Sequence, residues 1–260
     1  MRKQTEPIKD CTAVVFCGGR AARIRSILRG LPKALVPIAG RPYLVCLLTK
    51  LKSIGFTRCV LCISPFALDI KRRLRSTREL GLEIRFSKDS GIVENAGALW
   101  CAMGFIDTNT ILCLNGDTIV DVDYHALIQE HMKRKPIVSL VASSRSDQPH
   151  PEGVVLSSAL WVKDIVEEEL DRAESTFRKN RLRYMSNSGV YVINRDRLSK
   201  NWPVRFRTGK LETGLFRYLA RKHCVWAFDN GYRYLLDFGS PDRLKKLRRD
   251  MDRIEKLFMS

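Results

Sequence analysis

The sequence predicts an α/β protein, a single domain whose mostly parallel mixed sheet carries helices on both faces. Two observations support this fold class. Through roughly the first 145 residues, short apolar runs of strand length alternate with segments of helix length, which is typical of a parallel sheet with crossover helices. The chain has 260 residues, of which 45% are hydrophobic, so it can bury one full core without a second domain.

The first part of the chain supplies the parallel strands and their helices. Strands are expected at residues 12–17, 59–63, 82–86, 111–114 and 137–141, and helices at residues 43–54, 67–74, 96–105 and 124–132. Ligands on such sheets gather at the carboxyl ends of the strands. The residues that follow Cys17 and Leu114 therefore mark the expected position of a site.

After about residue 150 the pattern is mixed. Strands are expected at residues 153–156, 160–166 and 189–193, with a polar, charged loop at residues 167–183. A serine-proline pair is then followed by apolar residues at helical spacing, which predicts a final amphipathic helix packed on the core. We expect one domain over residues 1–260, with a first half at about 11–145, a second half at about 146–240 and the C-terminal helix at 241–260.

The net charge of +18 is large for a protein that acts on small molecules. Basic runs at residues 71–75, 178–183 and 245–249 could form a nucleic-acid or anionic-membrane surface. No recognised nucleic-acid module accompanies them, and basic runs on helices are usually solvated faces. An anionic substrate pair and a basic exterior explain the charge more simply, so a specific nucleic-acid partner is not expected.

Most of the eight cysteines are expected to be small core residues, namely Cys17, Cys46, Cys59, Cys62, Cys101 and Cys113. Cys59 and Cys62 have the spacing of a metal or redox motif, but alternation along a strand sends their thiols to opposite faces. The four histidines show no paired ligand spacing. Residues 1–10 are charged, and no apolar run reaches the roughly eighteen residues that a membrane span needs, so a cytoplasmic protein is expected.

Residues 16–42 join the end of the first predicted strand to a glycine pair, an arginine-rich loop and a lysine. Gly18 and Gly19 would let backbone N–H groups approach an anion closely. Arg23 adds a permanently charged fork, and Lys33 adds a point charge that can follow a leaving pyrophosphate. These groups together could hold the phosphates of a nucleoside triphosphate. The glycines alone could also serve only to turn the chain.

This segment resembles the signature of the sugar-1-phosphate nucleotidyltransferases, the NDP-sugar pyrophosphorylases, which runs strand, Gly-Gly-x-Gly-Thr-Arg-Leu, then Pro-Lys. Arg23 and Lys33 are kept, whereas Ala21 and Ala22 replace the third glycine and the threonine. The added residues 25–28 are most similar to the branch that guanylylates D-glycero-D-manno-heptose 1-phosphate. The resemblance implies a Rossmann-like, glycosyltransferase-A-like nucleotidyltransferase fold, with a nucleotide-binding first half and a β-rich, sugar-binding second half.

The resemblance also implies that two aspartates hold Mg²⁺. Asp117 follows the predicted strand at residues 111–114 and so emerges at the ligand edge of the sheet, where a carboxylate suits this hard cation. Asp237 lies in a segment similar to the family's Asp-x-Gly-Thr-Pro-Glu motif, whose aspartate is the second metal ligand. Asp117 could also be part of a simple turn, and Asp237 could support the turn before the final helix.

Residues 90–99 correspond to the family's loop beside the nucleotide base. Glu94 and Asn95 stand in place of its glycine and threonine, so the resemblance implies nucleotide contacts from both. A related branch that makes UDP-N-acetylmuramic acid also carries glutamate at the first position, which blurs the choice of base. Asn95 could instead be the N-cap of the following helix.

Five residues are implied to contact the sugar: Gly116, Gly153, Glu167, Asn187 and Glu212. Asn187 matches the asparagine that bonds sugar hydroxyls, and Gly153 a glycine that lets the sugar approach the backbone. Glu167 matches the glutamate of a Glu-Lys pair, but Glu168 replaces the lysine that binds the sugar's phosphate, so that charge would have to be met elsewhere. Glu212 could equally be an exposed glutamate on a surface helix.

The implied reaction joins a sugar 1-phosphate of heptose or mannose type to a nucleoside triphosphate, GTP, and yields NDP-sugar and pyrophosphate for surface polysaccharide or glycoconjugate synthesis. The alternatives are another base or sugar, or a sugar-nucleotide-binding paralogue with impaired catalysis, which the substitutions at positions 21, 22, 94 and 168 would explain. A Rossmann oxidoreductase is disfavoured because the first loop lacks the spaced glycines of that fingerprint. A homo-oligomer is compatible with the sequence.

Overall fold

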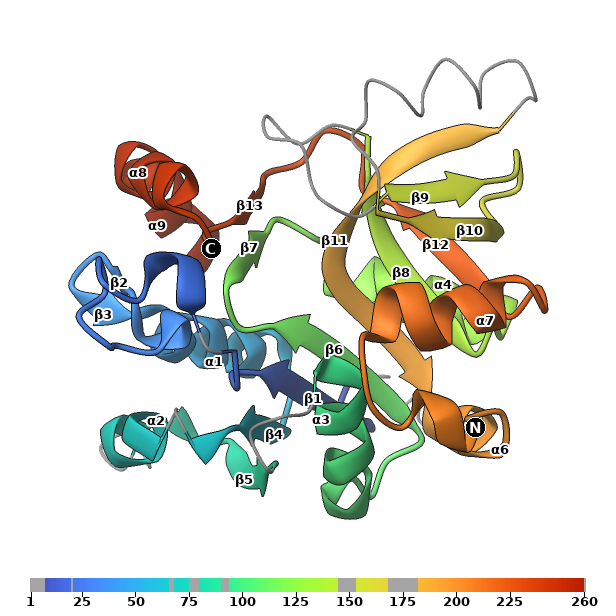
Figure 1. The fold of residues 1–260 in the computed structure, drawn as a ribbon, viewed down its shortest axis with the longest axis horizontal. Helices are drawn as coiled ribbons and strands as arrows, with labels where there is room; N and C mark the ends of the chain where they lie inside the picture. The colour runs from blue at the N-terminus through green and yellow to red at the C-terminus, as the bar shows by residue number, and fades with distance from the viewer. Residues whose placement is uncertain are drawn as a thin grey trace, which may run out of the picture.

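The computed structural model describes residues 8–19, 21–65, 68–74, 80–89, 94–144, 153–167 and 182–259. A sheet runs through the centre of the molecule (Figure 1). Its first half is parallel, in the order β5 (Glu83–Lys88), β4 (Arg58–Ile63), β1 (Cys11–Phe16) and β6 (Thr110–Asn115). The strands predicted from the apolar runs lie at these positions.

Strand β11 (Arg183–Asn194) joins the two halves of the sheet. It pairs antiparallel with β6, with β8 (Val138–Ser143) and with β9 (Gly153–Leu156). Strand β10 (Val162–Val166) pairs with β9, and β12 (Val225–Asp229) runs parallel to β8. The prediction at residues 189–193 covers only the end of β11, because the residues before it are polar yet buried, including Ser186, Asn187 and Ser188.

Helices follow the parallel strands as the pattern predicted: α1 (Tyr43–Ile54), α2 (Leu68–Arg73), α3 (Asn95–Ala102) and α4 (Tyr124–Arg134). Helix α1 starts after Pro42 and ends at Gly55, which has a φ of 112° that favours glycine. Residues Met103–Phe105, expected to continue α3, form a separate 3₁₀ turn.

Both faces of the sheet are covered. Ala13 and Val15 of β1 pack in the core that includes α1, whereas Val14 packs in the core that includes α3, as alternation along a strand requires. Cys59 and Cys62 also lie in opposite cores, which confirms the prediction for them, and burial raises the pKa of the Cys59 thiol to about 12. The prediction that Cys101 is a core residue is wrong, because α3 turns it to solvent.

The remaining helices divide between the two faces. On the face of α3 lie α6 (Arg195–Lys200), a 3₁₀ turn η6 (Val204–Phe206), a π-helical turn η7 (Leu211–Phe216) and α7 (Arg217–Ala220). Beside α1 lie the β2 (Pro37–Ile38) and β3 (Arg41–Pro42) ribbon and the C-terminal helix α9 (Met251–Met259), while α8 (Pro241–Arg249) packs on the same core next to the short strand β13 (Leu235–Asp237) (Figure 1).

The expected single C-terminal helix is thus two helices with Asp250 between them. The Asp250 carboxylate accepts a hydrogen bond from Tyr234 Oη at 2.9 Å and pairs with Lys246 at 3.2 Å. Asp250 therefore connects the junction between the two helices to Tyr234, just before β13. Within the described residues, none of these helices combines the length and the apolar character that crossing a bilayer requires.

Candidate active site

A cleft of about 640 Å³ opens where β1 and β6 end. This edge of an α/β sheet is where ligands bind, and the volume is in the range of small-molecule sites. Many residues singled out from the sequence line it, namely Gly18, Gly19, Lys33, Glu94, Asn95, Gly116 and Asp117. The structure therefore brings the glycine loop, the lysine and one of the two aspartates into a single cleft.

Gly116 holds the two strand ends together. Its N–H donates to the Phe16 carbonyl oxygen at 3.0 Å, and a Cβ at this position would lie 2.6 Å from that oxygen. Only glycine lets the loop after β6 come this close to β1. Gly116 thus shapes the cleft and carries Asp117 into it.

Two short strands make Asp117 and Asp237 neighbours. Strand β7 (Thr118–Val120) pairs antiparallel with β13 (Leu235–Asp237), and Asp237 lies opposite Thr118. The Phe238 N–H donates to the Asp117 carbonyl oxygen at 3.0 Å. The two residues implied as metal ligands therefore lie side by side although they are far apart in the sequence.

The carboxylates of these two aspartates approach a common point beside Gly239. A Cβ placed on Gly239 would lie 2.9 Å from Asp237 Oδ1, 2.9 Å from Lys33 Nζ and 3.5 Å from Asp117 Oδ2. A side chain at residue 239 would crowd these groups, so glycine is what lets the three side chains come together here. Carboxylate oxygens suit hard divalent cations, and Mg²⁺ is often bound by one or two carboxylates together with substrate phosphates. The described residues contain no cluster of three or more His, Cys, Asp or Glu, so phosphates and water would complete the coordination.

Lys33 and Arg23, both predicted to be catalytic, differ in position. Lys33 begins the 3₁₀ turn η2 (Lys33–Leu35) and lines the cleft, with Nζ 2.7 Å from Asp117 Oδ2. Arg23 lies in the turn η1 (Ala22–Ile24), is exposed and is not among the lining residues. A single turn buries only one side, and here the buried residue is Ile24.

A buried chain of hydrogen bonds connects the two halves of the protein. Asn95 Nδ2 donates to both carboxylate oxygens of Glu212 at 2.9 Å, and Tyr191 Oη donates to Glu212 Oε1 at 2.7 Å. Asn187 Nδ2 donates to Tyr191 Oη at 2.9 Å. Since a carboxylate only accepts, the tyrosine proton points to Glu212 and the tyrosine oxygen accepts from Asn187. Tyr191 thus links Asn187 to Glu212, which in turn binds Asn95 directly.

Two alternatives for these residues are wrong. Asn95 is not an N-cap, because the N-cap of α3 is Glu94, and the Asn95 Oδ1 accepts from the Leu211 N–H at 2.8 Å. Glu212 is not an exposed helix residue, because it is 3% exposed and lies in the π-helical turn η7. Such turns are frequent at functional sites.

Gly153 and Glu167 lie apart from the cleft lining. A Cβ on Gly153 would overlap the phenol group of Tyr184, so that ring occupies the space beside this glycine. Glu167 is exposed, pairs with Lys210 and accepts from Thr213 at 3.4 Å. The hydrogen bond from Lys210 holds the pKa of the Glu167 carboxyl below its ordinary value. Glu168 lies outside the described residues.

Sequence reasoning missed two charged residues of the site. Asp89 lines the cleft and is 7% exposed. It follows β5 much as Asp117 follows β6, so the strand-end rule applied to the predicted strand at 82–86 could have found it. Arg243, in α8, places Nη1 2.6 Å from Asp237 Oδ2. Nothing local marks Arg243, because its role depends on where β13 lies.

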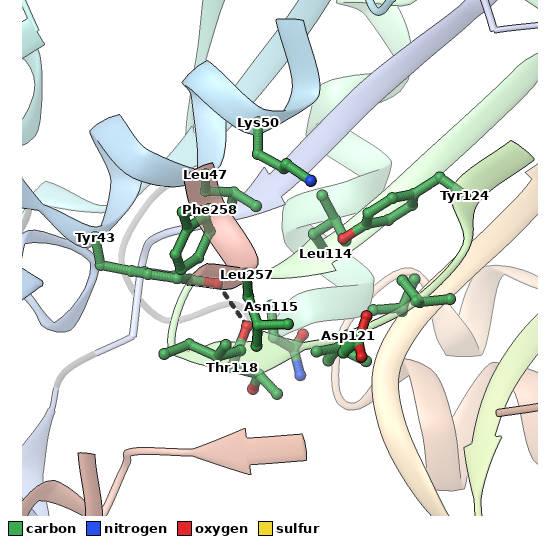
Figure 2. A pocket seen from close by; sticks show the side chains of 14 residues that line it. Tyr43, Leu47, Lys50, Leu114, Asn115, Thr118, Asp121, Tyr124, Leu257 and Phe258 are labelled. Atoms are coloured by element: carbon green, nitrogen blue, oxygen red, sulfur yellow. Dashed lines mark hydrogen bonds between the residues drawn. The ribbon is translucent and has the colours of Figure 1, made fainter. Parts of the chain in front are cut away.

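A second cavity, of about 80 Å³, lies beside the loop that carries Asp117, and residues on both sides of that loop help to line it. Figure 2 shows Tyr43 and Lys50 of α1, Tyr124 of α4 and Phe258 of α9 around it. The Tyr43 hydroxyl donates to the Thr118 carbonyl oxygen at 2.5 Å, and burial raises the pKa of this tyrosine well above its ordinary value. The C-terminal helix thus helps to enclose the base of the active-site loop.

Comparison with known proteins identifies relatives of this chain. It is 25% identical over 232 residues to D-glycero-alpha-D-manno-heptose 1-phosphate guanylyltransferase of Campylobacter jejuni, covering 88% of this chain and 95% of that protein. It is 26% identical over 234 residues to mannose-1-phosphate guanylyltransferase catalytic subunit beta of Drosophila pseudoobscura pseudoobscura. That match covers 88% of this chain but only 59% of the relative, so the chain spans less than two thirds of its length.

The fold has a solved counterpart. A structure described as a putative glucose-1-phosphate thymidylyltransferase from Bacillus anthracis superposes with a TM-score of 0.76 at 18% identity, covering 92% of this chain and 94% of that one. The predicted α/β fold is therefore confirmed. Residues 12–253 match the family model described as nucleotidyl transferase, which confirms the resemblance inferred from the first loop. Since this match spans most of the sequence, the chain belongs to the nucleotidyl transferase family.

Proposed function

We propose that this protein transfers a nucleotidyl group from a nucleoside triphosphate to a sugar 1-phosphate, with NDP-sugar and pyrophosphate as products. The observation that carries the proposal is the meeting of Lys33, Asp117 and Asp237 around Gly239, at the cleft that Lys33, Asp117 and the glycine loop line. This arrangement combines an acidic pair for a divalent cation with a lysine for phosphate in a cleft of nucleotide size.

The chemistry requires positioning and charge neutralisation. An oxygen of the sugar phosphate attacks the α-phosphorus, a new P–O bond forms, and the bond to the bridging oxygen of the leaving pyrophosphate breaks. The nucleophile is already an anion, so no strong general base is needed. A divalent cation, proposed to be Mg²⁺ held by Asp117 and Asp237, would stabilise the charge on the α-phosphate, and Lys33 would neutralise the phosphates that leave.

The remaining residues are proposed to place the two substrates. Gly18, Gly19, Glu94 and Asn95 line the cleft and are assigned to the nucleotide, while Gly116, Asn187 and Glu212 are assigned to the sugar side. Glu167, Gly153 and Arg23 lie away from the cleft lining, so their contacts would require the substrate to extend past it. Asn95 and Glu212 share hydrogen bonds, so the residues assigned to the nucleotide and to the sugar are in direct contact.

For the specific pair of substrates we propose GTP and a manno-configured heptose 1-phosphate. Two observations support this choice: the similarity of residues 25–28 to the heptose branch, and the names of the two relatives, both of which are guanylyltransferases. The alternative is a different base or sugar within the same reaction. A pyrophosphate-release assay that combines each of four nucleoside triphosphates with heptose, mannose and glucose 1-phosphates tests both the activity and the choice of substrates. Turnover with another pair would correct the specificity, and no turnover with any pair would refute the activity.

A second candidate is a sugar-nucleotide-binding paralogue with impaired catalysis. It is favoured by one observation, that Ala21 takes a left-handed backbone with a φ of 53° where the family motif has glycine. Calorimetric binding of NDP-sugar without turnover of any substrate pair would support this candidate over the first.

A further inference from the structure

The acidic pair at the cleft carries its own positive charges. Lys33 Nζ lies 2.7 Å from Asp117 Oδ2, and Arg243 Nη1 lies 2.6 Å from Asp237 Oδ2. The Arg243 and Asp237 side chains are only 13% and 14% exposed, against 17% and 27% for Lys33 and Asp117. The second ion pair is therefore the more deeply buried of the two, and solvent screens it less.

The two oxygens of Asp237 have different surroundings. Oδ1 accepts from the Gly239 N–H at 2.7 Å and lies on the side of Gly239 that Lys33 Nζ and Asp117 Oδ2 also approach. Oδ2 accepts from Arg243. Arg243 therefore fixes the rotation of this carboxylate and leaves Oδ1 toward the space in which a cation would be bound.

The two cations differ in how they can respond to a ligand. Lys33 has a flexible stem and a compact ammonium, so it can leave Asp117 for a phosphate oxygen. Arg243 carries a planar, charged fork, and it belongs to helix α8 next to the carboxylate with which it pairs. Its charge therefore remains beside Asp237 whether or not a substrate is present.

Two carboxylates and two cations leave these four side chains with no net charge. A divalent cation entering alone gains little from them, because it meets the positive charge of Arg243 beside one of its two protein ligands. A triphosphate supplies the missing negative charge and draws Lys33 away. We propose that Arg243 is a positioning residue for Asp237 whose permanent charge keeps the metal site weak until the nucleotide arrives. This inference rests on the proposed function, since it takes Asp117 and Asp237 as metal ligands.

Direct titration with Mn²⁺, followed by electron paramagnetic resonance in the absence of nucleotide, tests the proposal on the full chain. Arg243→Gln keeps a hydrogen-bond donor but removes the charge, and we expect it to bind Mn²⁺ about tenfold more tightly than the wild type. Arg243→Lys keeps the charge and should stay within about threefold of the wild type. Arg249→Gln removes an exposed charge from the other end of α8 and is the matched control, expected to change binding by less than about twofold.

Several outcomes would overturn the proposal. If Arg243→Gln binds Mn²⁺ with the wild-type affinity, or more weakly, or if neither protein binds it measurably, Arg243 serves only to anchor α8. Arg243→Met, which keeps most of the aliphatic stem, replaces the glutamine variant if thermal melts show that the latter is unfolded. The Mn²⁺ measurement requires no turnover, so it stays readable if the substrate matrix refutes the proposed activity.

Discussion

Most candidate residues of the first half line an open cleft, whereas Asn187 and Glu212 of the second half lie in a buried hydrogen-bond chain. Lys33 and Asp117 remain partly exposed at the end of the parallel strands, while Asn187 and Glu212 are 2% and 3% exposed. The charged groups of the first half are therefore accessible from the cleft. The second half holds a few polar groups rigidly, so that their orientation is decided before a ligand binds.

The largest effect is expected from the charged groups of the cleft. Asp117→Asn removes a proposed metal ligand and the partner of Lys33, so turnover should fall by about a thousandfold or more with the fold intact. Lys33→Ala should cause a loss of similar size. Initial rates of pyrophosphate release measure both. Asp107→Asn, at an exposed aspartate paired with Arg85, is the control. Near-wild-type rates in either cleft variant would show that the charged groups of the first half are not needed for turnover.

A smaller and more selective effect is expected in the buried chain. Tyr191→Phe leaves Glu212 and Asn187 each without one hydrogen-bond partner, and a bond to a charged group contributes about 1.5–3 kcal/mol. We expect KM for the sugar 1-phosphate to rise about tenfold while KM for the triphosphate changes less than about twofold.

Tyr234→Phe is a close control for that variant. Tyr234 is 4% exposed and also donates to a carboxylate, that of Asp250, at 2.9 Å, but in the C-terminal region. The Tyr234→Phe variant should lower the free energy of unfolding without changing the KM for either substrate. Equal changes in both KM values for Tyr191→Phe would show that the chain serves the two substrates together.

Replacing Ala21 in the first loop by glycine should stabilise the protein. Ala21 has a left-handed backbone with a φ of 53°, which costs an L-residue about 1–2 kcal/mol and costs glycine little. Allowing for the greater freedom of glycine in the unfolded chain, Ala21→Gly should stabilise the protein by about 0.5–1 kcal/mol in urea unfolding. Ala22→Gly, one residue later in the turn η1, should destabilise it instead, by up to about 1 kcal/mol. Opposite signs are the expected result, and a loss of stability for Ala21→Gly would contradict it.

The smallest effect is expected at the surface pair of the second half. Glu167 and Lys210 are 49% and 43% exposed, so Lys210→Met should change the free energy of unfolding by less than about 0.5 kcal/mol. The pKa of Glu167, lowered by Lys210, should rise toward its ordinary value in that variant, which NMR titration would detect. A large loss of stability would show that this pair acts as part of the buried network.

The sequence located most of the first half because its signals are local. The apolar run of β6 predicts a strand, and Asp117 directly follows it, so the strand-end rule places this carboxylate at the ligand edge. Helix α1 was predicted with its observed bounds because a proline precedes it and a glycine ends it. The fold class follows from the same local patterns, and the family from the resemblance of residues 16–42 to its signature.

The second half was harder to predict because its contacts join distant segments. The hydrogen bonds between Asn95 and Glu212 span 117 residues of sequence, and the strand β13 that presents Asp237 has only three residues. A strand this short has too little periodicity to be recognised. Its existence depends on its pairing with β7, and so does the ion pair that Arg243 forms with Asp237.

The sequence by itself determined the α/β fold, because strand periodicity and turn residues are visible within short windows, and it indicated the family through the resemblance of residues 16–42 to the family signature. Only the tertiary structure decided that Lys33, Asp117 and Asp237 meet around Gly239, that Arg23 is not among the residues that line the cleft, and that Arg243 pairs with Asp237. The physical reason is that a site of opposed charges is defined by distances between chain segments, and those distances are set by the packing of the whole sheet and not by any one segment.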